Sequence, residues 1–542
     1  MVNHVESSHH INQKETIDVS YESTGFFSKL VADYLSGNEN LREFYKHPVS
    51  IEGIRASIQE RKAFKTNRKL LVASLTKQYE GIHLNALQEQ NLQSLLGEDT
   101  FTITTAHQPN IFTGPLYFIY KILHAIKLAN ELKLQLPEYD FVPVYYMGSE
   151  DADLDELGYI YLNGEKRIWE TNQTGAVGRM KIDKAFLQLI DSIEGQLGIH
   201  PFGNRLIAVF RECYSIGKTI QQATLELVNN LFASYGLLIV IPDNAALKQS
   251  FNSFIKKELE EQFSNKAVSE TIHELSKHYK PQAGGRELNL FYLIEDKRER
   301  IELSTKGYTV TSLNKNWTLN EILQELEQYP ERFSANVILR GVFQETILPN
   351  IAFIGGGGEL AYWLELKKVF EAVQVPYPML VLRNSFLLVK QSFIERIKKL
   401  CFKIEDFFAD EMVLINKLVK RDSENRLTLD DEIKAIESTY NSLRNTAATV
   451  DTTLLLHIDS LQKNALKKIN ELEKKLLRAE KRKFKDEQHQ IATIKRILFP
   501  RNSLQERIDN FAPFYAIGGK EWIDFVYNHT FAFEQLFRII EY

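Results

Sequence analysis

The sequence predicts an α/β protein with a doubly wound parallel β-sheet over residues 101–385, followed by an α-helical coiled coil over residues 386–500. Two observations carry this prediction. Short apolar runs that suit buried strands alternate with helical stretches up to about residue 385, and a heptad repeat replaces them beyond that point. The chain has 542 residues, 44% hydrophobic and 25% charged, which is typical of a folded protein with two or three domains.

Residues 1–100 are mostly helical in pattern, and we expect them to form an N-terminal segment that packs on the sheet. In FFSKLVADYLSG (26–37), apolar residues recur at intervals of three and four, and Gly37 suits a helix stop.

Residues 101–147 predict the first strand–helix–strand unit of the sheet. FTITTA (101–106) is short and β-branched, LYFIYKILHAIKLANELK (116–133) is an amphipathic helix, and FVPVYYM (141–147) is again strand-like. Further strands are predicted at four apolar runs that end in polar residues or glycine: LLIVIPD (237–243), NVILR (336–340), IAFIG (351–355) and MLVLRN (379–384). The segment of about 155–235 is predicted to be an insertion that mixes short strands with helices.

The coiled coil is predicted from apolar residues that step by three and four alternately. They are Ile433, Ile436, Tyr440, Leu443, Ala447, Val450 and Leu454 and, after a break, Leu466, Ile469, Leu472, Leu476 and Ala479. Pro500 ends the helix, and residues 501–542 are expected to return to the core. The seam fits either an antiparallel hairpin within one chain or a coiled coil across a dimer, and its length favours a homodimer. The charged run 467–487 is expected to be a solvated face, with a nucleic-acid patch as the alternative.

Composition argues against several classes of protein. The formal net charge of -5 argues against a general nucleic-acid binder. Cys213 and Cys401 are too few for a disulfide framework or for a zinc site built from several thiolates. No apolar run approaches the length of a membrane span, about 18 residues, and the N-terminus has no signal-peptide pattern. We therefore expect a soluble cytoplasmic protein with no nucleic-acid or membrane partner.

Polar motifs follow three of the predicted strands, at the edge where sheets of this kind bind ligands. In the turn after residue 106, the neutral imidazole of His107 and nearby N–H groups suit a phosphate or carboxylate, with turn capping as the alternative. The acidic motif SEDADLDE (149–156) could bind an ammonium group, coordinate magnesium or act as a base, or be a solvated loop. In FIGGGGELAYW (353–363), four glycines allow a ligand to approach the backbone closely, with a flexible turn as the alternative. Glu359 in that motif favours a cationic or hydroxyl group.

Three other polar segments are weaker candidates. LRNS (382–385) places Arg383 at a strand end, where it could hold a carboxylate or phosphate. PQAGGRELNLF (281–291) and PRNSLQERIDNF (500–511) are either binding loops or structural segments.

Four motifs taken together resemble the bacillithiol-synthesis cysteine-adding enzymes, the BshC family. The motifs, in this order, are HQPNIFTGPLYFIYKILHAIKLA (107–129), VPVYYMGSEDADLDEL (142–157), LPNIAFIGGGGELAYWLELKKVF (348–370) and LFPRNSLQERIDNF (498–511). The resemblance runs from about residue 20 to the C-terminus. It implies a Rossmann-like core similar to that of class I aminoacyl-tRNA synthetases, with inserted segments, and a coiled-coil domain used in dimerisation.

The resemblance also implies a reaction. A ligase of this family joins the carboxyl group of L-cysteine to the amine of glucosaminyl-malate to complete bacillithiol, and ATP with magnesium is expected to activate the carboxyl group. The sequence shows no lysine-rich adenylate loop of the KMSKS kind. The alternatives are a class I synthetase-like enzyme that transfers an aminoacyl group to another amine, a tRNA-charging enzyme, and a non-catalytic dimeric coiled-coil scaffold.

The motifs and the resemblance together predict the site residues. The predicted catalytic residues are His107, Glu150, Asp151 and Asp153; the substrate-binding residues are Gln108, Asn110, Lys121, Glu359, Tyr362, Trp363, Arg383 and Asn384; and the nucleotide-binding residues are Gly355, Gly356, Gly357 and Gly358. No residue is assigned as a dedicated metal ligand. Asp151 is expected to bind the cysteine ammonium group, Glu150 or Asp153 to act as the base, and Arg383 to bind the malyl carboxylates.

The chain departs from the family's pattern at three positions. Asn110 stands where glycine is expected, Ala152 where histidine is usual, and Gly357 where proline is usual. If a histidine at position 152 transfers protons in other members, His107 has to serve here.

Overall fold

The computed structural model of the chain describes residues 16–305 and 307–542, which divide into two compact units. The larger unit is Asp18–Phe386 with Leu504–Arg538, and the smaller is Leu387–Ser503 with Ile539–Tyr542 and the described residues up to Ile17. The first fifteen residues of the predicted N-terminal segment lie outside the described residues.

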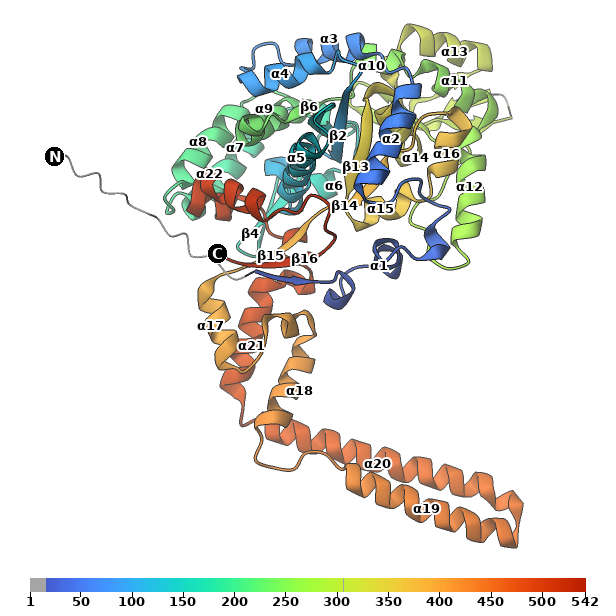
Figure 1. Ribbon diagram of the computed structural model, residues 1–542, viewed down its shortest axis with the longest axis vertical. Helices are drawn as coiled ribbons and strands as arrows, with labels where there is room; N and C mark the ends of the chain where they lie inside the picture. The colour runs from blue at the N-terminus through green and yellow to red at the C-terminus, as the bar shows by residue number, and fades with distance from the viewer. Residues whose placement is uncertain (1–15, 306) are drawn as a thin grey trace, which may run out of the picture. The chain divides into compact units, whose positions relative to one another are not determined.

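A five-stranded parallel sheet forms the centre of the larger unit (Figure 1). Its strands lie in the order β14 (Met379–Leu382), β13 (Asn350–Gly355), β2 (Thr100–His107), β3 (Asp140–Met147) and β6 (Leu238–Val240), and every neighbouring pair is parallel. The chain builds outward from β2 through β3 to β6, and then returns to add β13 and β14 on the other side of β2. This is the doubly wound topology, so the predicted fold class is confirmed.

Helices cover the sheet and complete its core. Helix α5 (Tyr117–Gln135) packs on β2 and β3, and α2 (Ile51–Ala63) packs on β13. Ile54 of α2, Leu128 of α5 and Ile103 of β2 belong to one buried cluster. Because the strands are buried on both faces, most of them are encoded by continuous apolar runs, whereas the central strand β2 mixes apolar residues with threonines that are also buried.

Four helices precede β2 among the described residues: α1 (Lys29–Leu35), α2, α3 (Arg68–Gln78) and α4 (Ala86–Ser94). Gly37 follows α1 with a φ of 71°, a left-handed conformation that glycine adopts without steric cost.

Two excursions interrupt the sheet between its strands. Between β3 and β6 the chain forms β4 (Tyr159–Leu162), β5 (Glu165–Ile168), α7 (Lys184–Leu197), α8 (Gly203–Cys213) and α9 (Ile220–Phe232). A second excursion between β6 and β13 was not predicted; its helices include α11 (Asn252–Glu261), α12 (Phe263–Leu275) and α13 (Leu319–Gln328). It also holds an antiparallel sheet in which β7 (Leu290–Ile294) lies between β12 (Phe333–Ala335) and β8 (Lys297–Arg300).

The strand predicted at NVILR (336–340) is wrong, because these residues begin helix α14 (Val337–Ile347). The side chain of Asn336 caps this helix and accepts hydrogen bonds from the N–H groups of Ile338 at 2.9 Å and Leu339 at 3.4 Å. A short buried apolar run does not distinguish a strand from a helix by its periodicity, and the cap decides here. As a result, Arg340 lies in the first turn of a helix.

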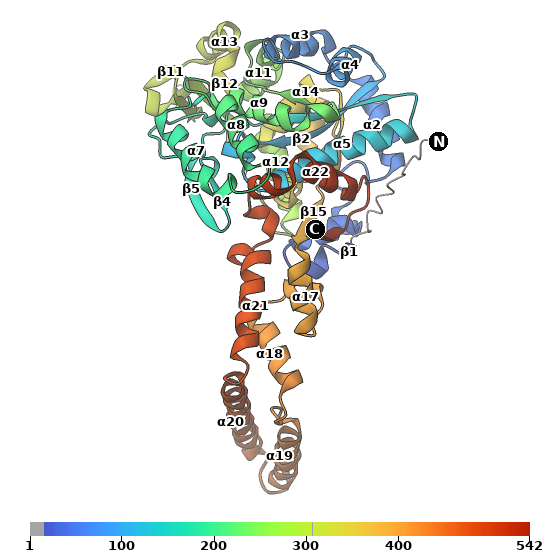
Figure 2. The ribbon, with the colours of Figure 1, turned by 90° about the vertical axis from the view of Figure 1, so that its left-hand side faces the viewer.

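The smaller unit is mostly helical, as predicted for the C-terminal domain. The expectation that strands end at about residue 385 is wrong, because β15 (Ser385–Val389) and β16 (Phe537–Glu541) form a three-stranded sheet with β1 (Thr16–Val19), in the order β1-β16-β15. The longest elements of the smaller unit, α19 (Asp430–Val450) and α20 (Leu455–Lys481), lie side by side as a hairpin (Figure 2), so the first of the two alternatives forms within the chain. Leu443, Val450 and Leu472 of the predicted seam are 48%, 76% and 45% exposed. Throughout the described residues, no helix has both the length and the apolar character needed to cross a membrane.

Candidate functional site

A cavity of about 880 Å³ opens beyond the carboxyl ends of the central strands, within the larger unit. Its wall includes His107 at the end of β2, Gly148 after β3, Gly356 after β13 and Arg383 after β14. Doubly wound sheets bind their ligands at this edge, where the strand order reverses. The reversal lies between β2 and β13, so His107 and Gly356 flank it.

This cavity brings together most of the predicted site residues: His107, Gln108, Asp151, Asp153, Gly356, Gly357, Gly358, Glu359, Tyr362 and Arg383. The remaining ones do not line it: Asn110, Lys121, Glu150, Gly355, Trp363 and Asn384. The functional roles assigned to all of them stay predictions.

His107 brings a neutral imidazole to the cavity. Its ring packs against Tyr117 and Phe118, with the ring centroids 5.3 Å apart in both cases. Burial, followed by the nearby cations Lys121 and Arg383, holds the pKa of His107 well below its usual range. Its Nε2 is shielded from solvent and has no hydrogen-bond partner in the described part of the chain. A neutral ring with a free nitrogen can donate or accept one hydrogen bond to a ligand, depending on its tautomer.

Asp151 is held by two arginines. Arg340 binds it in a bidentate manner, with Nη1 donating to Oδ2 at 2.8 Å and Nη2 donating to Oδ1, and Nη1 of Arg298 lies 3.9 Å from Oδ1. Burial alone would raise the pKa of Asp151, but Arg340 and Arg298 hold it below its usual value. The charge of Asp151 is therefore compensated before any ligand binds.

The two candidate bases have different surroundings. Glu150 is buried, pairs with the Lys248 ammonium group and accepts a hydrogen bond from Ser334 Oγ at 3.1 Å. Asp153 is exposed in the cavity wall, and its carboxylate has no hydrogen bond or ion pair with any described residue. Of the two, only Asp153 has a carboxylate that is free toward the cavity.

Glu359 stabilises the glycine-rich turn through hydrogen bonds to groups of the chain itself. Its Oε2 accepts hydrogen bonds from the Gly356 N–H at 2.8 Å and from Lys121 Nζ at 2.5 Å. The cationic partner that the sequence favours for Glu359 is therefore a residue of the chain. A Cβ added at Gly356 would lie 3.5 Å from both Glu359 Oε2 and Arg383 Nε, whereas one added at Gly358 would meet nothing within 4 Å. The turn is therefore in ordinary van der Waals contact at Gly356 and open at Gly358.

Arg383 is bound to the segment 500–511. Its Nη2 donates to Glu506 Oε1 at 2.8 Å, and both side chains are buried. Burial would lower the pKa of Arg383, but Glu506 keeps it above its usual value. Asn510 of the same segment donates a hydrogen bond to the Phe112 carbonyl at 2.9 Å. This segment therefore fixes both the end of β14 and the turn after β2.

Three predicted substrate-binding residues are engaged in structural contacts. Trp363 is buried and stacks on Phe353 with ring centroids 4.3 Å apart. Asn384 exchanges hydrogen bonds with the backbone of Phe531, and Asn110 is buried in the turn after β2. These contacts account for the polar groups of Asn384 without a ligand, whereas Asn110 Oδ1 and Trp363 Nε1 are buried with no hydrogen-bond partner among the described residues.

The cavity also holds residues that the sequence analysis did not select. Phe291, Arg298 and Arg300 come from the β7–β8 hairpin, Arg286 from the loop before it, and Arg340 from the start of α14. The polar motif PQAGGRELNLF signalled Arg286 and Phe291. In contrast, Arg298 and Arg300 lie in a charged run that resembles a solvated turn, so no local signal distinguished them.

Positive charge is in excess on the cavity wall. The wall carries the arginines 286, 298, 300, 340, 383 and 507, against the carboxylates of Asp151, Asp153 and Glu359. Such a wall favours an anionic ligand, such as one that carries carboxylates or phosphates. In the parts of the chain that the structure describes, no group of three or more His, Cys, Asp or Glu side chains is placed to hold a metal ion.

Comparisons with known proteins reveal close relatives along nearly the whole chain. Proteins named "Putative cysteine ligase BshC" from Flavobacterium johnsoniae and Flavobacterium psychrophilum are each 39% identical to it, over 96% and 97% of this chain and 99% of theirs. A protein of the same name from Cytophaga hutchinsonii is 35% identical over 90% of this chain and 92% of its own. A solved structure described as a "putative arginyl t-RNA synthetase" from Campylobacter jejuni covers 78% of this chain and 98% of that chain at 12% identity. Its TM-score of 0.21 is too low to carry an argument.

Family models match both parts of the chain. Residues 13–384 match the N-terminal Rossmann-like domain of bacillithiol biosynthesis BshC, and residues 386–542 match its C-terminal coiled-coil domain. The doubly wound sheet and the helical hairpin are the two architectures that these models describe. The chain therefore belongs to the BshC family of bacillithiol biosynthesis.

Proposed function

We propose that this chain is a ligase that joins the carboxyl group of L-cysteine to the amine of glucosaminyl-malate and so completes bacillithiol. The observation that carries the proposal is the cavity at the carboxyl edge of the sheet, in which Asp153 is a free carboxylate, His107 is neutral and arginines are in excess. Such a ligase has to hold anionic substrates and to remove a proton from an amine. The cavity offers groups for both tasks, and the relatives' name of cysteine ligase supports the same assignment.

The reaction needs an activated carboxyl group, because hydroxide is a poor leaving group. We assign ATP, with magnesium, as the activating cosubstrate. A carboxylate oxygen of cysteine attacks the α-phosphorus and pyrophosphate leaves. The sugar amine then attacks the acyl carbon, AMP leaves, and a proton of the amine passes to a base. The first step exchanges one P–O bond for another. The second forms a C–N bond, breaks the acyl C–O bond to AMP and moves one proton from the nitrogen to the base.

The surroundings of each acidic residue decide its role in this scheme. Because the Glu150 carboxylate already forms an ion pair with Lys248, we assign Asp153 as the base that takes the proton from the amine. Asp151 has both oxygens bound by Arg340, so we assign it to positioning that guanidinium rather than to binding the cysteine ammonium group. His107 is assigned to hydrogen bonding of the phosphate through Nε2, where a neutral donor stabilises developing negative charge.

The proposal is tested by incubating the purified full chain with L-cysteine and glucosaminyl-malate, with and without ATP and magnesium. Bacillithiol and AMP are followed by mass spectrometry. We expect bacillithiol only with ATP, in equal amount with AMP. Formation of the amide on glucosamine but not on glucosaminyl-malate would assign the chain to another acceptor. No amide under any condition, with a folded protein, would contradict the ligase, and Ala152→His would be the first variant to examine.

We also propose that the chain is a homodimer through the α19–α20 hairpin. A two-helix hairpin leaves Leu443, Val450 and Leu472 exposed, although they lie on the repeating apolar seam. Light scattering after size exclusion should give twice the chain mass, and Leu472→Glu should give the monomer mass. A monomeric wild-type protein would contradict the proposal.

A further inference from the structure

The cavity arginines that no carboxylate pairs with at short range are Arg507, which donates to the Phe26 carbonyl at 3.1 Å, and those of the β7–β8 hairpin and the loop before it, which lie together. The guanidinium carbon of Arg298 lies 4.1 Å from the centroid of the Phe291 ring, and that of Arg300 lies 5.0 Å from the same centroid. Nε of Arg298 also donates to Ser334 Oγ at 3.1 Å. Arg286 joins them in the cavity wall. We call Arg286, Arg298 and Arg300, with Phe291, the arginine wall.

The arginine wall differs from the cations at the strand ends, which the chain itself neutralises. Arg340 is paired with Asp151, and Arg383 is paired with Glu506. In contrast, the guanidinium group of neither Arg286 nor Arg300 forms an ion pair or a hydrogen bond with any described residue, although the backbone of Arg286 exchanges hydrogen bonds with the Asn289 side chain. The like charges of Arg298 and Arg300 lie over one Phe291 ring and repel each other, so an anion bound at Arg300 lowers this repulsion.

We propose that the arginine wall is the subsite for the dicarboxylate of the acceptor, the malyl group, with Arg286 and Arg300 binding its two carboxylates. This inference rests on the proposed function and replaces Arg383, whose charge Glu506 already compensates, in that role. A guanidinium is flat and presents paired donors, which match the two oxygens of a carboxylate. The Phe291 ring supports that plane for Arg300.

The connectivity of the acceptor agrees with this placement. In a glucosaminyl-malate, the malyl group is attached to the anomeric carbon, and the amine is attached to the next carbon of the sugar. The carboxylates and the reacting amine are therefore separated by one edge of the ring, so their subsites have to be adjacent. Burial lowers the pKa of Arg298, and nearby carboxylates oppose this shift, Asp151 first and Asp153 among them. The proposed base thus lies within electrostatic range of the arginine wall.

The test is the double variant Arg286→Ala/Arg300→Ala of the full chain, with KM determined separately for glucosaminyl-malate, L-cysteine and ATP. We expect KM for glucosaminyl-malate to rise by about tenfold to a hundredfold, since each charge-assisted hydrogen bond contributes substantially, while the KM values for cysteine and ATP stay unchanged. Arg300→Lys should raise KM for glucosaminyl-malate less than Arg300→Ala does, because lysine keeps the positive charge but lacks the paired donors of the guanidinium group. The matched control is Lys297→Ala, which removes a charge from the same hairpin outside the cavity wall.

A second acceptor sharpens the test. Methyl glucosaminide carries the amine without the dicarboxylate, so the wild-type preference for glucosaminyl-malate over it should collapse in the double variant. A rise confined to KM for ATP would make the arginine wall a phosphate site and overturn the inference. Unchanged KM values in the folded variant would overturn it equally.

Titration calorimetry with glucosaminyl-malate alone separates this inference from the proposed function. Binding that weakens in the double variant supports the subsite even if the wild-type protein forms no bacillithiol, and then only the ligase assignment fails. If the wild-type protein forms bacillithiol and the double variant binds the acceptor as well as the wild type does, the subsite fails and the ligase assignment stands.

Discussion

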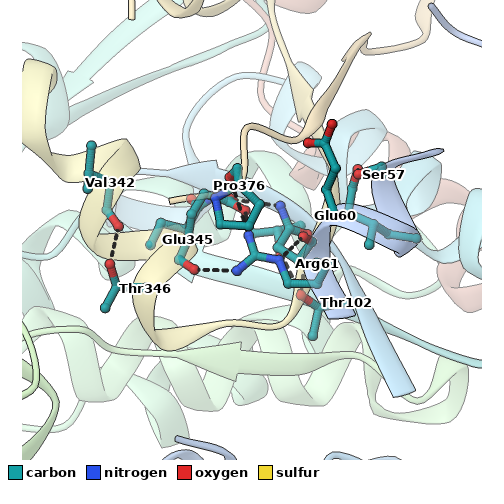
Figure 3. Close-up of polar contacts among 12 residues, drawn as sticks. Ser57, Glu60, Arg61, Thr102, Val342, Glu345, Thr346 and Pro376 are labelled. Carbon is teal, nitrogen blue, oxygen red and sulfur yellow. Dashed lines mark hydrogen bonds and ion pairs between the residues drawn. The ribbon is translucent and has the colours of Figure 1, made fainter. Parts of the chain in front are cut away.

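At the amino end of β13, every guanidinium nitrogen of Arg61 of α2 donates a hydrogen bond to the chain, whereas at the carboxyl end of the same sheet the cavity keeps some cations unpaired. Arg61 donates from Nε to the Asn350 carbonyl at 2.9 Å, and from Nη1 and Nη2 to the carbonyl and Oε2 of Glu345, both at 2.7 Å (Figure 3). The side chains of Arg61 and Glu345 are 1% and 0% exposed. Arg286 and Arg300 in the cavity have no such partner among the described residues.

Helix α14 connects the two ends, because it begins at the cavity with Arg340 and ends beside Arg61 with Glu345. Burial raises the pKa of Glu345, and the charge of Arg61 opposes that shift. This buried ion pair holds α2 on the sheet, and its hydrogen-bonding groups are already occupied and are not available to a ligand. The comparison shows that the charge of Arg61 serves the fold, whereas at the carboxyl end some cations are paired within the chain and the guanidinium groups of Arg286 and Arg300 stay unpaired.

The largest effect is expected from Asp153→Asn, which breaks the chemistry of the carboxyl end alone. Loss of a positioned general base should lower kcat by about a hundredfold to ten-thousandfold, with the unfolding midpoint unchanged. Steady-state kinetics and thermal unfolding measure the two quantities. The matched control is Asp155→Asn, an exposed acid two residues away that does not line the cavity and should keep full activity. Equal losses in both variants would remove the base assignment.

Arg61→Ala is expected to break the amino end alone. It leaves Glu345 buried without its partner, which should lower the free energy of unfolding by about 3 to 5 kcal/mol. Urea unfolding at pH 7.5 measures the loss, and the folded variant should bind glucosaminyl-malate as the wild type does. The loss should shrink as the pH falls, because Glu345 can then become neutral by protonation.

A double variant decides whether charge or packing matters at that end. Arg61→Met/Glu345→Leu removes both charges and keeps apolar volume, so it should lose much less stability than Arg61→Ala. If the double variant is as unstable as the single one, the hydrogen bonds to the backbone of β13 are the larger contribution.

Asp509 is expected to make the stability of the chain depend on pH. Burial raises its pKa to about 7, and its backbone carbonyl accepts a hydrogen bond from the Leu116 N–H at 2.7 Å. Because the folded pKa lies above the unfolded one, this group's stabilisation is complete only at low pH and is lost as the pH rises through about 7. Asp509→Asn should therefore add stability on the order of 4 kcal/mol at pH 8 and much less near pH 4. Unfolding midpoints of both proteins at the two pH values measure it; an equal gain at both would exclude titration as the cause.

The sequence predicted the parts of this comparison that depend on local patterns. Buried strands gave continuous apolar runs, and the polar turn after His107 marked the cavity. What it could not predict depends on partners far away in the chain. Arg383 is neutralised by Glu506, 123 residues away, and this pairing determines that it is less available to substrate. Arg300 lies in a charged run that would be a solvated turn in most proteins. It reaches the cavity wall only because the excursion between β6 and β13 folds over the carboxyl edge of the sheet.

The smallest effect is expected at the open end of the glycine-rich turn. A methyl group at Gly358 meets no protein atom within 4 Å, so Gly358→Ala should not disturb the folded chain, and in helix α15 (Gly357–Trp363) it should add about 0.4 to 1 kcal/mol of stability. If a nucleotide approaches this backbone closely, the same methyl group should raise KM for ATP by about threefold to tenfold, equivalent to roughly 1 kcal/mol. Stability and affinity would then change in opposite directions.

Gly195→Ala is the matched control for that variant. Gly195 lies in helix α7, its added Cβ also meets nothing within 4 Å, and it does not line the cavity. It should stabilise the chain by a similar amount and leave KM for ATP unchanged. If Gly358→Ala behaves like Gly195→Ala in both measurements, the phosphates do not pass over the glycine-rich turn. The free Nε2 of His107 and the arginine wall would then be the remaining anion-binding groups of the cavity, and the nucleotide and the dicarboxylate would have to share them.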